Sequence, residues 1–142
     1  IIDEASVEAL PGVHAWLRAL QEAGIRCALA SSTPRANIDC VLPRLQLPMR
    51  FESIITAEDV QRGKPDPEVF LLAARRLEMP PERCVVFEDT PVGIEAGVAA
   101  GMKVIAVSTT HRQTALGGAD RVVQRLDALS VRQLAAWFVS VS

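Results

Sequence analysis

The sequence predicts an α/β fold built around a mainly parallel sheet. Short apolar segments alternate with amphipathic ones along most of the chain, which is typical of strands alternating with helices. Glycine and proline mark the boundaries between these segments. With 142 residues, of which 49% are hydrophobic, the chain is long enough to bury a core and is most simply one domain.

The first unit of the pattern is a helix followed by a strand. A turn at Pro11 precedes the helix, and Gly24 ends it. Apolar residues recur between them at helical spacing: Val13, Trp16, Leu17 and Leu20. Residues 25–30 then predict a buried strand, and the polar residues 31–34 predict a turn directly after it.

The second unit has the same order but a longer polar loop. A helix is predicted around Ile38 and Leu42, and residues 51–57 contain a second strand. The polar residues 58–66 predict a loop, after which Pro67 can open another helix.

The rest of the chain continues the alternation. Its predicted elements are strands at 84–87, 103–107 and, more weakly, 121–123, and helices at 92–100 and 131–139. Right-handed crossovers between parallel strands place helices on both faces of a sheet. The sequence therefore predicts a Rossmann-like three-layer domain.

Composition disfavours several classes of partner. The formal net charge is -2, which favours neither a nucleic acid nor a membrane surface. No apolar run approaches the roughly 20 residues of a membrane span, and the N-terminus does not resemble a signal peptide. The three cysteines lack metal-ligand spacing and are expected to be reduced thiols. We therefore predict a cytoplasmic protein.

Polar residues lie where a ligand would bind to such a sheet. Ligands of parallel sheets bind beyond the carboxyl ends of the strands. Ser31 and Ser32 follow one predicted strand directly, and Lys64 lies on a loop that can reach the same edge. Hydroxyl groups and a fixed cation are the groups that the oxygens of a phosphoryl group require. The pattern predicts a phosphate site.

Two adjacent carboxylates, Glu88 and Asp89, follow another predicted strand. They repel one another unless a divalent cation neutralises them, and oxygen ligands with room for water suit Mg²⁺. Structural roles remain open for the same residues. The two acids can cap the helix that follows, residues 31–33 can cap the helix after Pro34, and Lys64 can be a solvated loop residue.

Three segments of the chain carry recognisable motifs. Residues 28–35 read ALASSTPR, residues 63–70 read GKPDPEVF and residues 86–97 read VFEDTPVGIEAG. In this order and at this spacing, they resemble the second, third and fourth signature motifs of the haloacid dehalogenase-like hydrolases. More narrowly, they are similar to the subgroup that contains β-phosphoglucomutase and small sugar-phosphate phosphatases. The resemblance extends from about Leu10 to the last predicted strand.

The resemblance implies a role for each matching residue. It makes Ser31 the hydroxyl that binds the transferring phosphoryl group, and Lys64 the cation that stabilises the charge of that group and of the nucleophile. Glu88 and Asp89 would bind Mg²⁺, Asp89 most directly and Glu88 either directly or through water. Further phosphate or substrate contacts are expected from Ser32, Thr33 and Arg35.

The resemblance also implies an element that this sequence lacks. Family members begin with a strand ending in Asp-x-Asp-Gly-Thr, whose first Asp attacks phosphorus and whose second is the general acid and base. No two of the seven aspartates here stand two positions apart, and no strand is predicted before Asp3. A helical cap follows that motif in this subgroup. We interpret residues 1–10 as a cap-to-core linker and residues 11–142 as a core domain without its first strand and cap.

For the intact protein, the resemblance implies a Mg²⁺-dependent phosphatase acting on a small, sugar-like phosphate monoester through an aspartyl-phosphate. A phosphomutase is the alternative among enzymes, and a truncated, noncatalytic binding domain is the alternative outside them. The chain opens on Ile1 rather than Met, so we expect an upstream segment. Without the attacking aspartate, this chain alone is expected to be inactive. Self-association or the N-terminal segment is expected to complete the sheet.

Overall fold

Six short strands form one parallel sheet in the computed structural model, which describes residues 2–3, 13–45, 51–108, 117–124 and 130–139. The strands are β1 (Ile2–Asp3), β2 (Ala28–Ala30), β3 (Ser53–Ile55), β4 (Val85–Glu88), β5 (Lys103–Val107) and β6 (Arg121–Val123). Their order across the sheet is β3-β2-β1-β4-β5-β6, and every neighbouring pair is parallel. The predicted α/β fold is confirmed.

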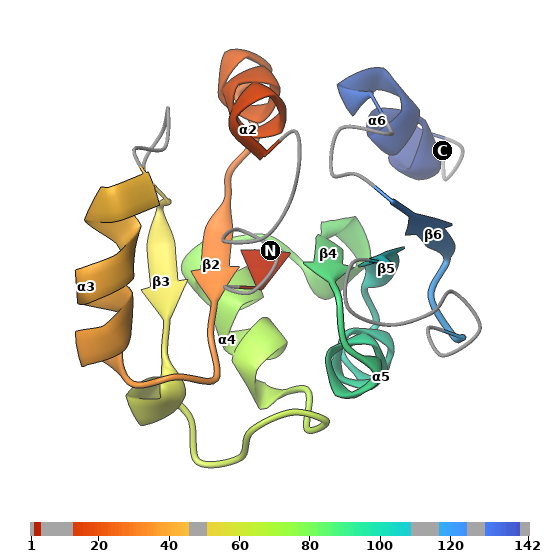
Figure 1. Cartoon of the computed structure of the whole chain (residues 1–142). Helices are drawn as coiled ribbons and strands as arrows, with labels where there is room; N and C mark the ends of the chain where they lie inside the picture. The colour runs from red at the N-terminus through yellow and green to blue at the C-terminus, as the bar shows by residue number, and fades with distance from the viewer. Residues whose placement is uncertain (1, 4–12, 46–50, 109–116, 125–129, 140–142) are drawn as a thin grey trace.

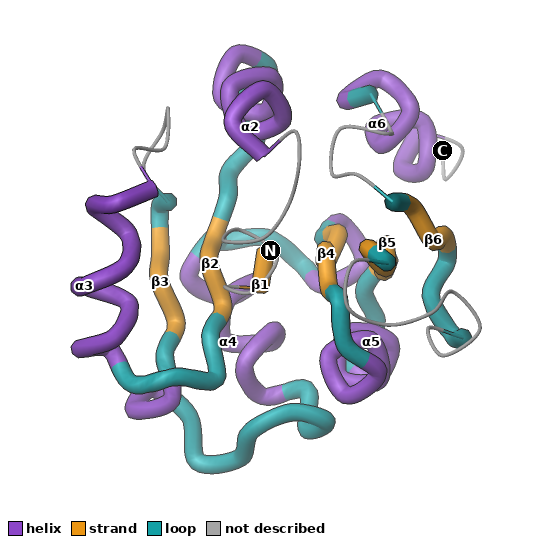
Figure 2. Tube along the Cα trace, in the orientation of Figure 1, coloured by secondary structure: helices purple, strands orange, loops and turns teal. Residues whose placement is uncertain are grey.

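Helices cover both faces of this sheet. They are α2 (Val13–Glu22), α3 (Arg35–Leu45), α4 (Glu68–Arg76), α5 (Pro91–Ala99) and α6 (Val131–Val139), with short 3₁₀ turns at Ala57–Asp59 and Pro81–Arg83. Figure 1 shows α2 and α6 above the strands and α4 and α5 below them. Figure 2 shows the strands as the layer between these helices. This is the three-layer arrangement that the alternating pattern predicts.

The sheet is buried on both faces because successive side chains of a strand point to opposite sides. In β2, Ala28 and Ala30 pack in the cluster that contains Phe70 of α4 and Ile94 of α5. Leu29 packs in the opposite cluster, with residues of α2, α3 and α6. Strands that are covered on both sides have apolar residues at most positions, which is why they read as nearly continuous apolar runs in the sequence.

Glycine ends two of the helices, as the sequence predicts. Gly24 has φ +72° after α2, and Gly101 has φ +78° after α5, a left-handed conformation that glycine adopts without strain. After α2, the N–H of Gly24 donates to the Gln21 carbonyl at 3.0 Å, and the N–H of Ile25 donates to the Leu20 carbonyl at 3.0 Å. These bonds satisfy the last carbonyls of the helix and direct the chain into β2.

The structure differs from the prediction at the N-terminus. Ile2 and Asp3 form β1 in the centre of the sheet, although no strand is predicted in this part of the sequence. Ile2 is in register with Leu29 of β2 on one side and with Phe87 of β4 on the other. Two residues are too few to show a periodic pattern in the sequence, and the strand is recognised only through its pairing with β2 and β4.

Most of the predicted linker, residues 4–10, lies outside the described residues, so the proposed boundary between linker and core stays a prediction. Cys27 and Cys84 are buried free thiols, as expected, and burial raises the pKa of both. Among the described helices, none has the length and apolar character needed to cross a membrane.

Candidate active site

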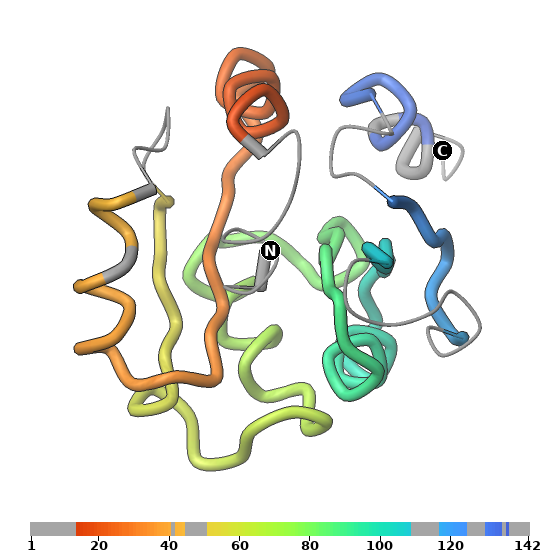
Figure 3. Tube along the Cα trace, viewed as in Figure 1, coloured from red at the N-terminus to blue at the C-terminus, as the bar shows by residue number. Residues whose placement is uncertain are grey.

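Three polar segments lie at the carboxyl edge of the sheet. Ser31 directly follows β2, and Glu88 is the last residue of β4. The loop of residues 60–67, which we call the Lys64 loop, joins the 3₁₀ turn after β3 to α4. In Figure 3 the chain leaves β2, β3 and β4 at their lower ends, so the carboxyl ends of these strands lie at one edge of the sheet. Parallel strands bring these segments to the same edge of the sheet.

Ser31 lies at the start of the turn between β2 and α3. It is 1% exposed, and its N–H donates to the Ile55 carbonyl of β3 at 2.9 Å. Its hydroxyl is 2.8 Å from the Thr33 hydroxyl and accepts the Thr33 N–H at 3.0 Å. Ser32, between them, is exposed. The turn thus holds two hydroxyl groups together at the sheet edge, with Ser31 fixed by the backbone.

Lys64 is buried rather than solvated. Its ammonium lies 3.0 Å from Glu88 Oε2, and the exposed fractions of the two side chains are 6% and 0%. The same ammonium lies 5.1 Å from the centre of the Phe70 ring, within the range of a cation–π interaction. A solvated loop lysine would make neither contact. The loop therefore directs the cation of Lys64 into the carboxyl edge of the sheet.

Glu88 uses both of its carboxylate oxygens. Oε2 faces Lys64, while Oε1 accepts the Asp89 N–H at 3.0 Å and the Thr90 hydroxyl proton at 3.2 Å. A completely buried carboxylate needs such partners, because burying it without them costs roughly several kcal/mol of free energy. The geometry therefore assigns Glu88 first to Lys64 and to the start of α5.

Asp89 has a free acceptor. The residue is 2% exposed, and its Oδ1 has no hydrogen-bond partner among the described residues. A buried carboxylate oxygen is normally satisfied, so this atom calls for a ligand. No group of three or more acidic, cysteine or histidine side chains suited to a metal occurs in the described part of the chain. Asp89 thus fits a cation site to which those residues contribute only part of the ligand set.

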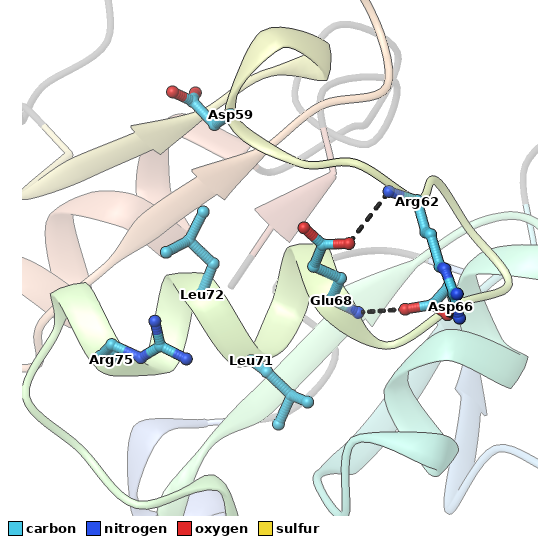
Figure 4. A pocket seen from close by; sticks show the side chains of 7 residues that line it. All are labelled: Asp59, Arg62, Asp66, Glu68, Leu71, Leu72 and Arg75. Carbon is cyan, nitrogen blue, oxygen red and sulfur yellow. Dashed lines mark hydrogen bonds and ion pairs between the residues drawn. The ribbon is translucent and has the colours of Figure 1, made fainter.

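Two acids hold the Lys64 loop on its other side. Glu68 accepts the N–H groups of Gln61 and Arg62, each at 2.9 Å, and Asp66 accepts the Glu68 N–H at 2.9 Å. Figure 4 shows Glu68 and Asp66 between this loop and α4. Both residues were missed from the sequence. The only sequence signal was their position around Pro67, where acids commonly cap the start of a helix.

A cavity of about 460 Å³ lies between the Lys64 loop and α4 (Figure 4). It is lined by Asp59, Arg62, Asp66, Glu68, Leu71, Leu72 and Arg75. None of the residues predicted to bind phosphate or metal lines it. The cavity is therefore separate from the carboxyl edge that carries Lys64 and Glu88.

Arg35 has structural partners. Its guanidinium donates to the Ile54 carbonyl at 2.9 Å and to Asp59 at 3.2 Å, and its backbone N–H donates to Glu58 at 3.0 Å. Thr56 also binds both acids through its hydroxyl. These bonds join the start of α3 to the end of β3. The structure thus gives Arg35 a role in holding these elements together, and its predicted contact with phosphate or substrate stays a prediction.

This network predicts a loss of stability in acid. The backbone N–H of Arg35 is the main cause that lowers the pKa of Glu58 from 4.5, and the N–H of Thr56 is the main cause that lowers the pKa of Asp59 from 3.8. Because both pKa values are lower in the folded state, the two carboxylates stabilise the fold above about pH 4.5. That contribution disappears as the pH falls through the folded values.

We therefore expect Asp59→Asn to lower the free energy of unfolding at neutral pH and to have a smaller effect at about pH 3, where the wild-type carboxylate is also being protonated. Urea unfolding at both pH values measures the difference. Asp39→Asn, at an exposed aspartate of α3, is the control. Equal destabilisation by Asp59→Asn at the two pH values would contradict the prediction.

The sheet order defines the centre of the candidate site. Ser31 directly follows β2 and Glu88 ends β4, and β1 lies between these two strands. Strands are spaced about 4.8 Å apart, so these two residues stand on backbones about 10 Å apart. Asp3 is the last residue of β1 and is in register with Ala30. A phosphoryl group that contacts both sides of the site would lie over the end of the central strand.

The comparison with known families agrees with the motifs. Residues 1–101 match a hydrolase family described as haloacid dehalogenase-like hydrolase. The chain belongs to this family. The three segments that carry Ser31, Lys64 and Glu88 all lie inside the matched region.

Two relatives of the chain are named as phosphatases. The chain is 40% identical over 123 residues to the chloroplastic 5-amino-6-(5-phospho-D-ribitylamino)uracil phosphatase of Arabidopsis thaliana, covering 87% of this chain and 33% of that protein. It is 40% identical over 127 residues to hexitol phosphatase A of Escherichia coli K12, covering 88% of this chain and 57% of that protein. The chain thus spans between a third and three-fifths of the length of these relatives.

A solved structure supports the same subgroup of haloacid dehalogenase-like hydrolases. The fold matches that of a β-phosphoglucomutase from Clostridium difficile with a TM-score of 0.79 and 28% sequence identity. The match covers 94% of this chain and 57% of the other. The subgroup predicted from the three motifs is therefore confirmed, and so is the fold.

Proposed function

We propose that the whole protein is a Mg²⁺-dependent phosphatase that hydrolyses a small, sugar-like phosphate monoester. The observation that carries this proposal is the buried Lys64–Glu88 pair beside the unpartnered Oδ1 of Asp89. A buried cation next to a free carboxylate oxygen suits a substrate that is itself anionic and is bound together with a metal ion. The phosphatase names of the curated relatives support the same reaction.

Ser31 and Lys64 would bind the phosphoryl group from two sides of the site. Ser31 would donate its hydroxyl proton to a non-bridging oxygen, with the adjacent Thr33 and Ser32 as further donors. Lys64 would stabilise the negative charge that develops on the oxygens during transfer. Both roles need donors that are fixed in advance, and the burial of Ser31 and Lys64 satisfies that requirement.

Asp89 would hold the magnesium ion, and Glu88 would act on it only indirectly, through Lys64 or water. The free Oδ1 of Asp89 is the oxygen donor that Mg²⁺ prefers, and the surrounding site leaves water or substrate oxygens to complete the ligand set. When bound, the metal would neutralise the charge of the phosphoryl oxygens. Asp89 would thus hold the metal ion near the start of α5.

The attacking group would come from the end of the central strand. In the subgroup this position belongs to Asp-x-Asp, which the 142 residues lack. We propose that a segment outside this chain carries it in the whole protein and takes the place that β1 occupies here, between β2 and β4. Phosphomutase activity is the second candidate, and the likeness to a β-phosphoglucomutase supports it.

Metal binding tests the site without requiring turnover. Calorimetric titration with Mg²⁺ and inorganic phosphate should show binding by the chain, and Asp89→Asn should weaken Mg²⁺ binding by roughly tenfold or more. Lys64→Ala should weaken phosphate binding more than Mg²⁺ binding. Asp39→Asn, which changes an exposed aspartate on α3, should change neither. Equal Mg²⁺ affinity in the wild type and Asp89→Asn would reject the metal assignment.

A further inference from the structure

Gly93 packs directly against the side chain of Glu88. A Cβ atom at position 93 would overlap the Cγ, Cδ and Oε2 atoms of Glu88. Glycine is unfavourable in a helix, by about 1 kcal/mol relative to alanine, so its presence in the first turn of α5 needs a reason. The reason here is space: the turn approaches a buried carboxylate too closely for any side chain at that position.

Thr90 connects the same turn to the same carboxylate. Its hydroxyl oxygen accepts the Gly93 N–H at 3.2 Å, which caps α5, and it donates its proton to Glu88 Oε1 at 3.2 Å. The Asp89 N–H donates to Oε1 as well, at 3.0 Å. Oε1 is therefore fixed by the start of α5, and Oε2 is directed at the Lys64 ammonium, 3.0 Å away.

We infer that Gly93 and Thr90 are positioning residues that orient Lys64 through Glu88. Gly93 leaves the space in which the Glu88 side chain lies, and Thr90 fixes the rotation of its carboxylate. Lys64 then takes its place between Glu88 and the Phe70 ring. The role of this orientation in phosphoryl transfer rests on the proposed function. The orientation of Lys64 itself can be measured without any assumption about the reaction.

The chain offers a selective probe, because Lys64 and Lys103 are its two lysines. Lysine labelled with ¹³C should give two sets of ε-methylene NMR signals at a fixed pH. The Lys64 signal should be displaced by the ring current of Phe70, whereas Lys103 is 47% exposed and serves as an internal reference. Gly93→Ala should shift the Lys64 signal toward that of Lys103.

Gly97→Ala is a matched control in the same helix. A Cβ there would lie 2.7 Å from Cγ2 of Val104 and 3.6 Å from Val86, so this variant also crowds the core, but one helical turn further along and against side chains other than Glu88. It should leave the Lys64 signal in place. An unchanged Lys64 signal in folded Gly93→Ala, or an equal shift in both glycine variants, would overturn the inference.

Variants at Thr90 provide a second test in case Gly93→Ala does not fold. Thr90→Val removes the hydroxyl with little change of shape and should shift the Lys64 signal, and Thr90→Ser should restore it. No difference between these two variants would overturn the inference. Phosphate titration of the same samples should show roughly tenfold weaker binding in Thr90→Val. If the wild type binds no phosphate but the Lys64 signals respond as expected, the proposed function fails and the inference stands.

Discussion

Replacing Lys64 by methionine should lower the free energy of unfolding by about 3–5 kcal/mol, the usual cost of removing one partner of a buried ion pair. Methionine replaces the four-atom stem of the lysine side chain but removes the cation 3.0 Å from the completely buried Glu88. Domains of this size are stable by about 5–15 kcal/mol, so the variant should be close to unfolding. Urea unfolding followed by circular dichroism measures the loss.

Lys103→Met is the control for this prediction. Lys103 also pairs with an acid, Asp120, but at 3.8 Å and with 47% of its side chain exposed. Exposed pairs contribute about 1 kcal/mol or less. The double variant Lys64→Met/Glu88→Gln removes both buried charges and should recover much of the lost stability. If Lys64→Met costs no more than Lys103→Met, the buried pair does not stabilise this fold.

The second large effect concerns activity. Residues 1–142 alone should not hydrolyse p-nitrophenyl phosphate measurably, whereas the whole protein with an upstream Asp-x-Asp should be faster by a factor on the order of 10⁴ or more. In the proposed site, Ser31, Lys64 and Asp89 would bind the phosphoryl group and the metal ion, and none of them would act as the nucleophile. A steady-state assay with Mg²⁺, on both proteins at equal concentration, measures the difference.

Two outcomes would contradict this prediction. Hydrolysis by residues 1–142 that is lost in Asp3→Asn would show that the last residue of β1 supplies the attacking carboxylate. An upstream coding sequence without Asp-x-Asp would instead favour the noncatalytic alternative. For the whole protein, release of inorganic phosphate from a sugar phosphate indicates a phosphatase, and an isomeric sugar phosphate indicates a mutase. Lys64→Ala in the whole protein should slow either reaction.

The whole-protein experiment also bears on the sheet. β1 pairs with β2 at two positions and with β4 at one, although it occupies the centre of the sheet. Central strands provide pairing partners on both sides, so a longer strand in this position would add hydrogen bonds to β2 and β4. The expectation of self-association for the isolated chain remains a prediction that its oligomeric state in solution can test.

The sequence indicated most of the fold because its signals are local. Four of the strands, β2, β3, β5 and β6, lie within or at the predicted apolar segments, and β4 begins and ends one residue later than predicted. Gly24 and Gly101 end helices where the sequence places their ends. Apolar runs, turns and helix ends depend on neighbouring residues, which a single sequence displays directly.

The candidate site was only partly predictable. The motifs indicated Ser31, Lys64, Glu88 and Asp89, but not Gly93 or Thr90, whose roles depend on the packing of α5 against β4. A glycine and a threonine in the first turn of a helix are ordinary in a sequence. Their significance appears only when a buried carboxylate lies against them.

The sequence by itself determined the alternating α/β pattern, the three motifs and the residues that would bind phosphate and metal. The tertiary structure decided which charged groups are partners. Arg35 and Asp59, like Lys64 and Glu88, are 24 positions apart. The sequence does not show that the first pair joins α3 to the 3₁₀ turn after β3, while the second is buried at the sheet edge. The tertiary structure also placed β1 in the centre of the sheet. The physical reason is the same in both cases. Backbone groups and buried charges find their partners in residues that are distant in the sequence, and no local sequence pattern connects such residues.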